Sequence, residues 1–349
     1  MTDHESPDSE DSERQRAEAL AQASAAGVHR LAIPTPFQVG RVNAYLIEDE
    51  PLTLVDSGPN SGKALDELER ALAGLGHAVE DIGLLVITHQ HIDHFGLAGI
   101  LARRSGADVA SLDELAGFLG DYSAEAELAD AYAQEIMSRH GIPTDVVIAL
   151  RAVSASFRGW GGAVQVTRPL ADGGELVLRD RTLKVLHRPG HSPSDTVLWD
   201  ESRGMLIAGD HLLGRISSNP LITRPLSARN GETARPQALV TYLASLRETR
   251  AMELDLMLPG HGDPITDHVA LIDERFRMHD RRAAKILGLI AHHPRTAHEI
   301  AAELWGNVAV TQAYLTLSEV LGHVDLLINA GRVVEREEGS VVRFEATGR

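Results

Sequence analysis

The heptapeptide from Thr88 to His94, which reads THQHIDH, constrains the fold of this chain more than any other stretch. It follows an apolar run, Ile82–Ile87, whose length and composition predict a buried strand. It precedes a second apolar run, 95–101, that predicts the start of a helix. The polar residues therefore lie on a turn at the carboxyl end of a strand, where α/β proteins place their sites.

The side chains of this turn suit a metal ion. In an extended segment His89 and His91 point to the same side, and Asp93 and His94 follow on the turn, where they can face a second point nearby. Neutral imidazole and carboxylate are ligand types of zinc. The alternative is a chance cluster of surface histidines, as for any short motif.

Three more predicted strands end in a residue of the same kind, namely His191, Asp210 and His261. A glycine precedes each of them and permits a close backbone approach or an unusual dihedral angle. Taken singly each position is weak, because a histidine after Pro-Gly is more often a turn residue than a ligand. Together with the first motif they supply seven candidate ligands, which suits two metal ions that share a bridging group.

Composition bounds the remaining properties. The chain has 349 residues and is 43% hydrophobic, enough for one large domain and a small one. Its net charge of −17 repels nucleic acids and anionic membranes unless a local basic patch intervenes. Cysteine is absent, which excludes thiolate ligands, and no apolar run could span a bilayer. We therefore expect a cytoplasmic protein without a membrane partner.

The pattern along the chain predicts three parts. Residues 1–27 are rich in acids and predict a disordered acidic tail that turns helical near 16–25. Residues 28–270 predict an α/β catalytic domain with a helical insertion at about 111–160, which is either plain packing or a lid or pocket wall. Residues 275–349 predict a winged-helix-like domain, whose expected elements are helices at 275–292, 296–305 and 311–329 and a hairpin of 332–337 and 340–345.

On these residues the chain resembles the metallo-β-lactamase-fold hydrolases. The motif 88–94 and then His191, Asp210 and His261 occur in the order of that superfamily, and the resemblance covers about residues 28–270. It implies an α/β architecture, the αβ/βα metallo-β-lactamase sandwich, with the metals at one edge. The part beyond resembles the winged-helix end of the β-lactamase-like protein 2 group.

The resemblance also implies a role for each ligand. His89, His91 and His191 hold one zinc ion, and Asp93, His94 and His261 hold the second. Asp210 bridges both ions, so the implied cofactor is two Zn²⁺ per chain, with iron and manganese as alternatives.

The implied reaction uses a hydroxide that bridges the two metals. Asp93 is the expected catalytic residue, because it orients that hydroxide as well as binding a metal. Asp56 and His211 are candidate hydrogen-bond partners of the ligating histidines, since a ligating imidazole needs an acceptor for its other N–H group. The alternative for Asp56 is a turn cap.

These observations predict a dinuclear zinc-dependent hydrolase of a small-molecule thioester, lactone or related acyl substrate. A thiolate leaving group needs little acid assistance, which favours a thioester. The alternative is a metal-dependent endoribonuclease or phosphodiesterase of the β-lactamase-like protein 2 type. A binding protein without activity would need broken ligand positions, and none of the seven is broken.

The charges of residues 275–349 argue against a nucleic-acid partner. This part carries ten basic and nine acidic residues, and the expected hairpin tip holds Glu337 and Glu338. The third expected helix contains Glu319 and Asp325 but no Lys or Arg, whereas a winged helix that binds DNA needs positive charge there. We expect a packing or dimerisation surface, so a homodimer stays open, and RNA remains an alternative partner.

Overall fold

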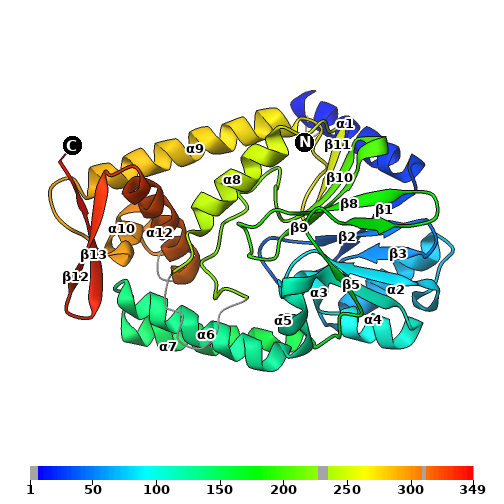
Figure 1. The fold of residues 1–349 in the computed structure, drawn as a ribbon, viewed down its shortest axis with the longest axis horizontal. Coiled ribbons are helices and arrows are strands. Elements are labelled where there is room, and N and C mark those ends of the chain that lie inside the picture. Colours follow the sequence, from blue (N-terminus) through cyan, green and yellow to red (C-terminus); the bar gives the residue numbers. More distant parts are fainter. Residues whose placement is uncertain (1–6, 227–234, 309–311, 349) are drawn as a thin grey trace, which may run out of the picture.

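Two β-sheets lie against each other in the computed structural model, which describes residues 7–226, 235–308 and 312–348 (Figure 1). The first sheet has the order β1-β2-β3-β4-β5-β6 and the second the order β11-β10-β9-β8-β7. The strands of the first sheet are β1 (Val28–Ile33), β2 (Val42–Ile47), β3 (Thr53–Val55), β4 (Leu84–Ile87), β5 (Asp108–Leu112) and β6 (Arg168–Leu170). Those of the second are β7 (Glu175–Val177), β8 (Thr182–His187), β9 (Thr196–Asp200), β10 (Met205–Gly209) and β11 (Leu256–Pro259).

Strand β4 shows why the sheets stack with helices outside them. All of its residues are buried, and neighbouring residues of a strand point to opposite faces of the sheet. Leu85 packs with the helices α2 (Gly62–Gly74) and α4 (Ala98–Ser105), whereas Val86 packs with the second sheet. Helix α8 (Ala238–Arg250) covers the outer face of that second sheet. The predicted αβ/βα sandwich is confirmed.

The amino-terminal part differs from the prediction of a disordered acidic tail over 1–27. Residues 1–6 lie outside the described part of the chain, and α1 (Pro7–Ala25) is a helix that packs on β1. Ala19 and Ala23, four residues apart on one helix face, are buried against the sandwich core. Arg16 adds an ion pair of 3.0 Å to Asp263 in the loop after β11. The helix expected near 16–25 is present, but it begins at Pro7 and packs on the sandwich, because acidic composition describes the exposed face and overlooks the two small residues that pack.

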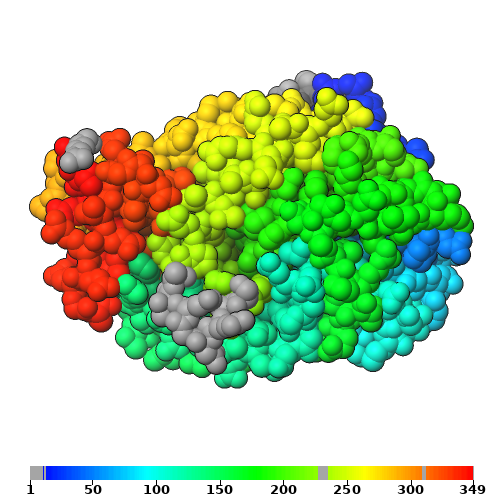
Figure 2. All heavy atoms as spheres, viewed as in Figure 1, coloured from blue at the N-terminus to red at the C-terminus, as the bar shows by residue number. Residues whose placement is uncertain are grey.

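The predicted insertion leaves the sandwich as a pair of helices. After β5 come η2 (Asp113–Leu115), α5 (Ala116–Gly120), α6 (Tyr122–Arg139), α7 (Thr144–Phe157) and η3 (Arg158–Trp160). Helices α6 and α7 pack together and reach the C-terminal part of the chain (Figure 1). There Arg139 of α6 forms an ion pair of 2.7 Å with Glu337, and the surfaces of the insertion and of the red hairpin meet (Figure 2).

The C-terminal part follows the predicted order of helices and hairpin. Its elements are α9 (His268–Leu289), α10 (Ala297–Trp305), α12 (Ala313–Asn329), β12 (Val333–Glu338) and β13 (Val341–Ala346). Residue 311, where we placed the start of the third helix, lies outside the described residues. The assignment of this arrangement as a winged helix stays a prediction.

Helix α9 crosses the boundary that we placed between residues 270 and 275. The Asp267 side chain caps its amino terminus by accepting a hydrogen bond of 2.9 Å from the Ala270 N–H. Ile272 near its start packs with the second sheet, and Ile286 near its end packs in the core of the C-terminal part. The two parts therefore share one continuous helix. Among the described residues, no helix is long and apolar enough to cross a membrane.

Candidate metal centre

The structure brings all seven predicted ligands together at one edge of the sandwich, in the segments that follow β4, β8, β10 and β11. They form two groups, and within each group the candidate ligand atoms lie within 4.8 Å of one another. The first group is His89, His91, His191 and Asp210, and the second is Asp93, His94 and His261. Residues that are up to 172 positions apart in the sequence thus share one site because their strands end at one edge of the sandwich.

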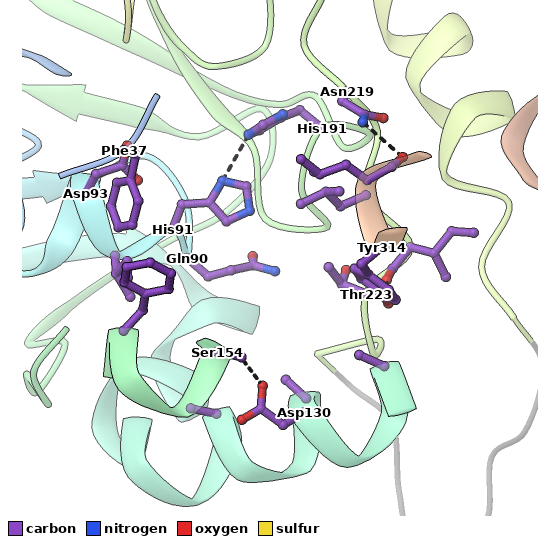
Figure 3. A pocket seen from close by; sticks show the side chains of 18 of the residues that line it. Phe37, Gln90, His91, Asp93, Asp130, Ser154, His191, Asn219, Thr223 and Tyr314 are labelled. Carbon is purple, nitrogen blue, oxygen red and sulfur yellow. Dashed lines mark hydrogen bonds between the residues drawn. The ribbon is translucent and has the colours of Figure 1, made fainter. Parts of the chain in front are cut away.

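Three imidazole nitrogens converge in the first group. His91 Nδ1 lies 3.1 Å from His89 Nε2. It also lies 3.0 Å from His191 Nε2, the contact that Figure 3 shows as a dashed line. Burial and the nearby histidines lower the pKa of His89 well below its usual range, and burial and His91 lower the pKa of His191 to about 3. These rings are therefore neutral at physiological pH and offer lone pairs, as a metal ion requires.

Asp210 faces both groups with one carboxylate. Its Oδ2 atom lies 3.6 Å from His191 Nε2 and 3.5 Å from His261 Nε2, while its Oδ1 atom lies 3.5 Å from His94 Nε2. These separations are longer than good hydrogen bonds, and both Oδ1 of Asp210 and Nε2 of His94 are buried without a hydrogen-bond partner. Buried nitrogen and oxygen atoms with lone pairs and without a hydrogen-bond partner fit a pair of metal ions, with Asp210 between them.

The charge of the second group also suits a cation. Burial lowers the pKa of His94, but Asp210, Asp56 and Asp93 outweigh burial and raise it well above the usual range. Burial raises the pKa of Asp93, but His94 and His261 outweigh burial and lower it. The carboxylates therefore attract a positive charge to this place, and a metal ion can supply it in place of a proton.

Asp56 contacts the ring of His94 directly and that of His89 through Thr88. Its Oδ2 atom accepts a hydrogen bond of 2.7 Å from His94 Nδ1 and one of 2.8 Å from the Thr88 hydroxyl. The Thr88 oxygen in turn accepts from His89 Nδ1 at 2.9 Å, so each of these rings directs Nε2 into the site. Asp56 adopts a positive φ of 59°, a conformation that aspartate and asparagine tolerate better than most residues. Thr88 was missed, although it directly precedes the first histidine.

His211 does not take the role that we predicted for it behind the ligands. Its Nε2 atom forms a hydrogen bond of 2.8 Å with the Thr249 hydroxyl of α8. The chain turns here, because Gly209 adopts a positive φ of 48° and the His211 N–H donates to the Ala208 carbonyl at 3.0 Å, and the turn directs His211 toward α8. The corresponding acceptor for His261 is a backbone group, the Arg41 carbonyl at 2.8 Å from Nδ1.

A cavity of about 770 Å³ opens from these ligands. His91, Asp93, His191, Asp210 and His261 line one wall, and residues of α6, α7 and the start of α12 line the others (Figure 3). In Figure 3 Tyr314 and Thr223 face His91 across the cavity. The insertion therefore forms a pocket wall, one of the two roles considered for it.

A third group of metal-ligand types lies apart from this cavity, between α9 and α12. It contains His279, Glu319 and His323. His323 Nδ1 donates to the Glu319 backbone carbonyl at 2.6 Å, so its Nε2 atom accepts the hydrogen bond of 3.1 Å from His279 Nδ1. One N–H···N bond accounts for this contact without a metal.

Known proteins resemble this chain over most of its length. Probable metallo-hydrolase YqjP of Bacillus subtilis (strain 168) is 30% identical, over 91% of this chain and 97% of that protein. A β-lactamase-like protein 2 homolog of Caenorhabditis elegans is 26% identical, over 74% of this chain and 69% of that protein. The crystal structure of a metallo-β-lactamase family protein from Thermus thermophilus superposes with a TM-score of 0.76 and 27% identity, covering 92% of this chain and 98% of that chain.

A thioesterase and a family profile match shorter stretches of the chain. An atrochrysone carboxyl ACP thioesterase of Aspergillus fumigatus is 23% identical, over 42% of this chain and 31% of that protein. The family profile of the Metallo-beta-lactamase superfamily matches residues 38–261, the stretch that contains all seven candidate ligands. The chain therefore belongs to the metallo-β-lactamase superfamily and is a metal-dependent hydrolase.

Proposed function

We propose that this chain is a dinuclear zinc-dependent hydrolase of acyl substrates, with thioesters first and lactones second. The observation that carries the proposal is the shared position of Asp210 between two groups of buried donors, at the wall of a largely apolar cavity. His89, His91 and His191 would hold one ion and Asp93, His94 and His261 the other. Iron and manganese are alternatives, because they also bind imidazole and carboxylate ligands.

When bound, the ions supply a water of lowered pKa and polarise the carbonyl under attack. Asp93 lines the cavity and stays ionised, so it can accept a hydrogen bond from the attacking water and orient it. In thioester hydrolysis the carbon–sulfur bond breaks, the water oxygen forms the new bond to carbon, and the released thiolate takes up a proton. The thiolate is a stable leaving group, so the reaction does not depend on a general acid at its sulfur atom.

The surroundings of the site favour an acyl substrate over RNA. Single-stranded nucleic acids bind along cationic grooves. Two of the three arginines in the described part of the cavity wall form ion pairs instead, Arg158 with Asp130 and Arg224 with Glu125, and a single cation, Arg151, does not make a cationic groove. Helix α12 offers no basic face, because it contains neither Lys nor Arg and much of it is buried in the C-terminal core.

A panel of substrates on metal-quantified protein tests the proposal. We expect hydrolysis of acyl-CoA thioesters and lactones, which stops when a chelator removes the metal and in the Asp210→Ala variant. Cleavage of single-stranded RNA or of bis-aryl phosphodiesters, without hydrolysis of any acyl substrate, would instead support the alternative of an endoribonuclease or phosphodiesterase.

A further inference from the structure

The cavity spans from the candidate metal centre to the core of the C-terminal part. At one end its wall includes the ligands at the sandwich edge. Elsewhere its wall includes Met137, Ile222 and Ala313, which belong to the apolar cluster shared by α6, α9, α10 and α12. A space of about 770 Å³ accommodates a molecule much larger than the group that reacts at the metals.

One face of α6 leaves this space open. Ala126, Ala129, Ala133 and Met137 follow one another at intervals of three and four residues, and all four line the cavity. Leu150 of α7 continues the wall. Because three of the α6 residues are alanines, the helix borders an apolar space without filling it.

Charged side chains of the wall near α6 pair with one another, whereas Ser217 and Asn219, in the loop after β10, keep buried oxygen atoms without a hydrogen-bond partner among the described residues. Asp130 accepts a hydrogen bond of 2.6 Å from the Ser154 hydroxyl and forms an ion pair with Arg158 (Figure 3). Glu125 forms an ion pair of 2.8 Å with Arg224. These two pairs neutralise the charges beside the alanines of α6, and Arg151 of α7 hydrogen-bonds to the Gln134 amide at 2.8 Å, so the part of a ligand that lies beside those alanines gains most from being apolar.

Apolar side chains also border the cavity where it meets solvent. Large hydrophobic residues are exposed there, which is unusual unless they contact a ligand or a partner. The rings of Phe37 and Phe157 pack edge to face with their centroids 5.5 Å apart. The exposed residues of this rim are Val39, Val153, Phe157, Ile216 and Leu315.

We infer that this cavity binds the apolar chain of the acyl group, while the carbonyl lies at the metal centre. The inference rests on the proposed function and adds its substrate class, a thioester of a medium or long aliphatic acid. It also gives the C-terminal part a role, since the start of α12 closes the cavity wall at Ala313, Tyr314 and Leu315. Burying one methylene group changes affinity by about fourfold, so the rate should rise steeply with chain length.

A chain-length series measures this effect. For acyl-CoA substrates from acetyl to hexadecanoyl, we expect kcat/KM to rise by up to about fourfold per methylene and then to level off where the cavity is full. In Ala133→Phe a ring occupies the space beside the helix, so the plateau should begin at a shorter acyl chain than in the wild type. Ala131→Phe is the matched control, because Ala131 lies on the exposed face of the same helix.

Binding provides a readout that does not depend on turnover. Non-hydrolysable S-alkyl-CoA thioethers, titrated by calorimetry, should bind more tightly as the chain grows, and Ala133→Phe should abolish that gain for long chains. Thioester hydrolysis without any dependence on chain length, or equal profiles for the two alanine variants, would overturn the inference and leave the proposed function standing. Absence of hydrolysis with every acyl substrate would instead refute the proposed function.

Discussion

Replacing Asp56 with Asn should weaken metal binding in the second group more than in the first. The Thr88 hydroxyl, which supports His89 of the first group, also lies 3.1 Å from Asp56 Oδ1, and asparagine keeps an acceptor at that position. The Asp56 carboxylate accepts the His94 Nδ1–H at 2.7 Å, which keeps the Nε2 lone pair directed at Asp210 and the proposed ion. An amide nitrogen at the same position donates instead. It therefore favours the tautomer of His94 that carries its proton on Nε2, and this tautomer cannot bind a metal through that atom.

The size of the effect follows from the lost contact. A hydrogen bond to a charged group contributes about 1.5–3 kcal/mol, which corresponds to about 10- to 150-fold in an equilibrium constant. Loss of a partner behind a metal ligand costs about 10- to 100-fold in metal affinity. We therefore expect the second ion to bind about 10- to 100-fold more weakly and the first ion to change much less. Asparagine is the appropriate replacement, because it tolerates the positive φ of 59° at this position.

The assay is zinc titration of metal-free protein in competition with a chromophoric chelator, which resolves two dissociation constants. A thermal denaturation curve of the metal-free variant shows whether the fold is kept. An unchanged affinity at both sites would refute the reasoning, because it would mean that Asp56 does not set the tautomer of His94. Equal loss at both sites would also contradict it, because it would mean that His89 depends on Asp56 through Thr88 as strongly as His94 does.

Three more outcomes follow from the geometry. A Cβ atom at Gly260 would lie 2.3 Å from Asp210 Oδ1, so the Gly260→Ala variant should lose bound metal. The control variant Gly214→Ala should keep its metal, because a Cβ atom there meets only an ordinary contact at 3.9 Å. Equal metal contents in the two variants would contradict this. Burial raises the pKa of the Asp195 carboxyl to about 8, compared with about 3.9 in an unfolded chain. The stability that protonated Asp195 contributes to the folded state is therefore complete below about pH 4 and is lost as the pH rises to about 8. Between pH 5 and 8 the melting temperature of the wild type should therefore fall more than that of Asp195→Asn, and parallel curves would argue against a protonated Asp195. The full chain should show no submicromolar, salt-sensitive binding of labelled single-stranded RNA in fluorescence anisotropy, since residues 275–349 have nearly balanced charge; such binding would favour the nuclease alternative.

The candidate ligands could be predicted because their chemistry is local in the sequence. His89 and His91 stand two positions apart at the end of an apolar run, and strand periodicity alone places them on one side. His211 was misjudged because a turn after β10, with Gly209 at a positive φ of 48°, directs its ring toward Thr249 of α8, and such a turn is not evident from local periodicity. Thr88 escaped notice because its role requires Asp56, which is 32 positions away in the sequence and meets it only in the folded sheet.

Packing between distant segments could not be predicted from local patterns. The start of α9 at His268 depends on contacts of Ile272 with the second sheet, and the burial of α1 depends on two alanines. The cavity was equally hidden, because the alanines of α6 look like ordinary helix formers until the C-terminal part stands opposite them. Sequence patterns indicate which residues are apolar but not which space they leave empty.

The metal content of the freshly purified full chain tests the central claim most directly. Elemental analysis should give close to two equivalents of transition metal per chain, predominantly zinc, and the same two equivalents in the His279→Ala/His323→Ala double variant, which removes the third group of donors. The Asp210→Ala variant should hold clearly fewer. A reproducible value near one equivalent in the wild type, unchanged after zinc is added, would contradict a dinuclear centre that shares Asp210.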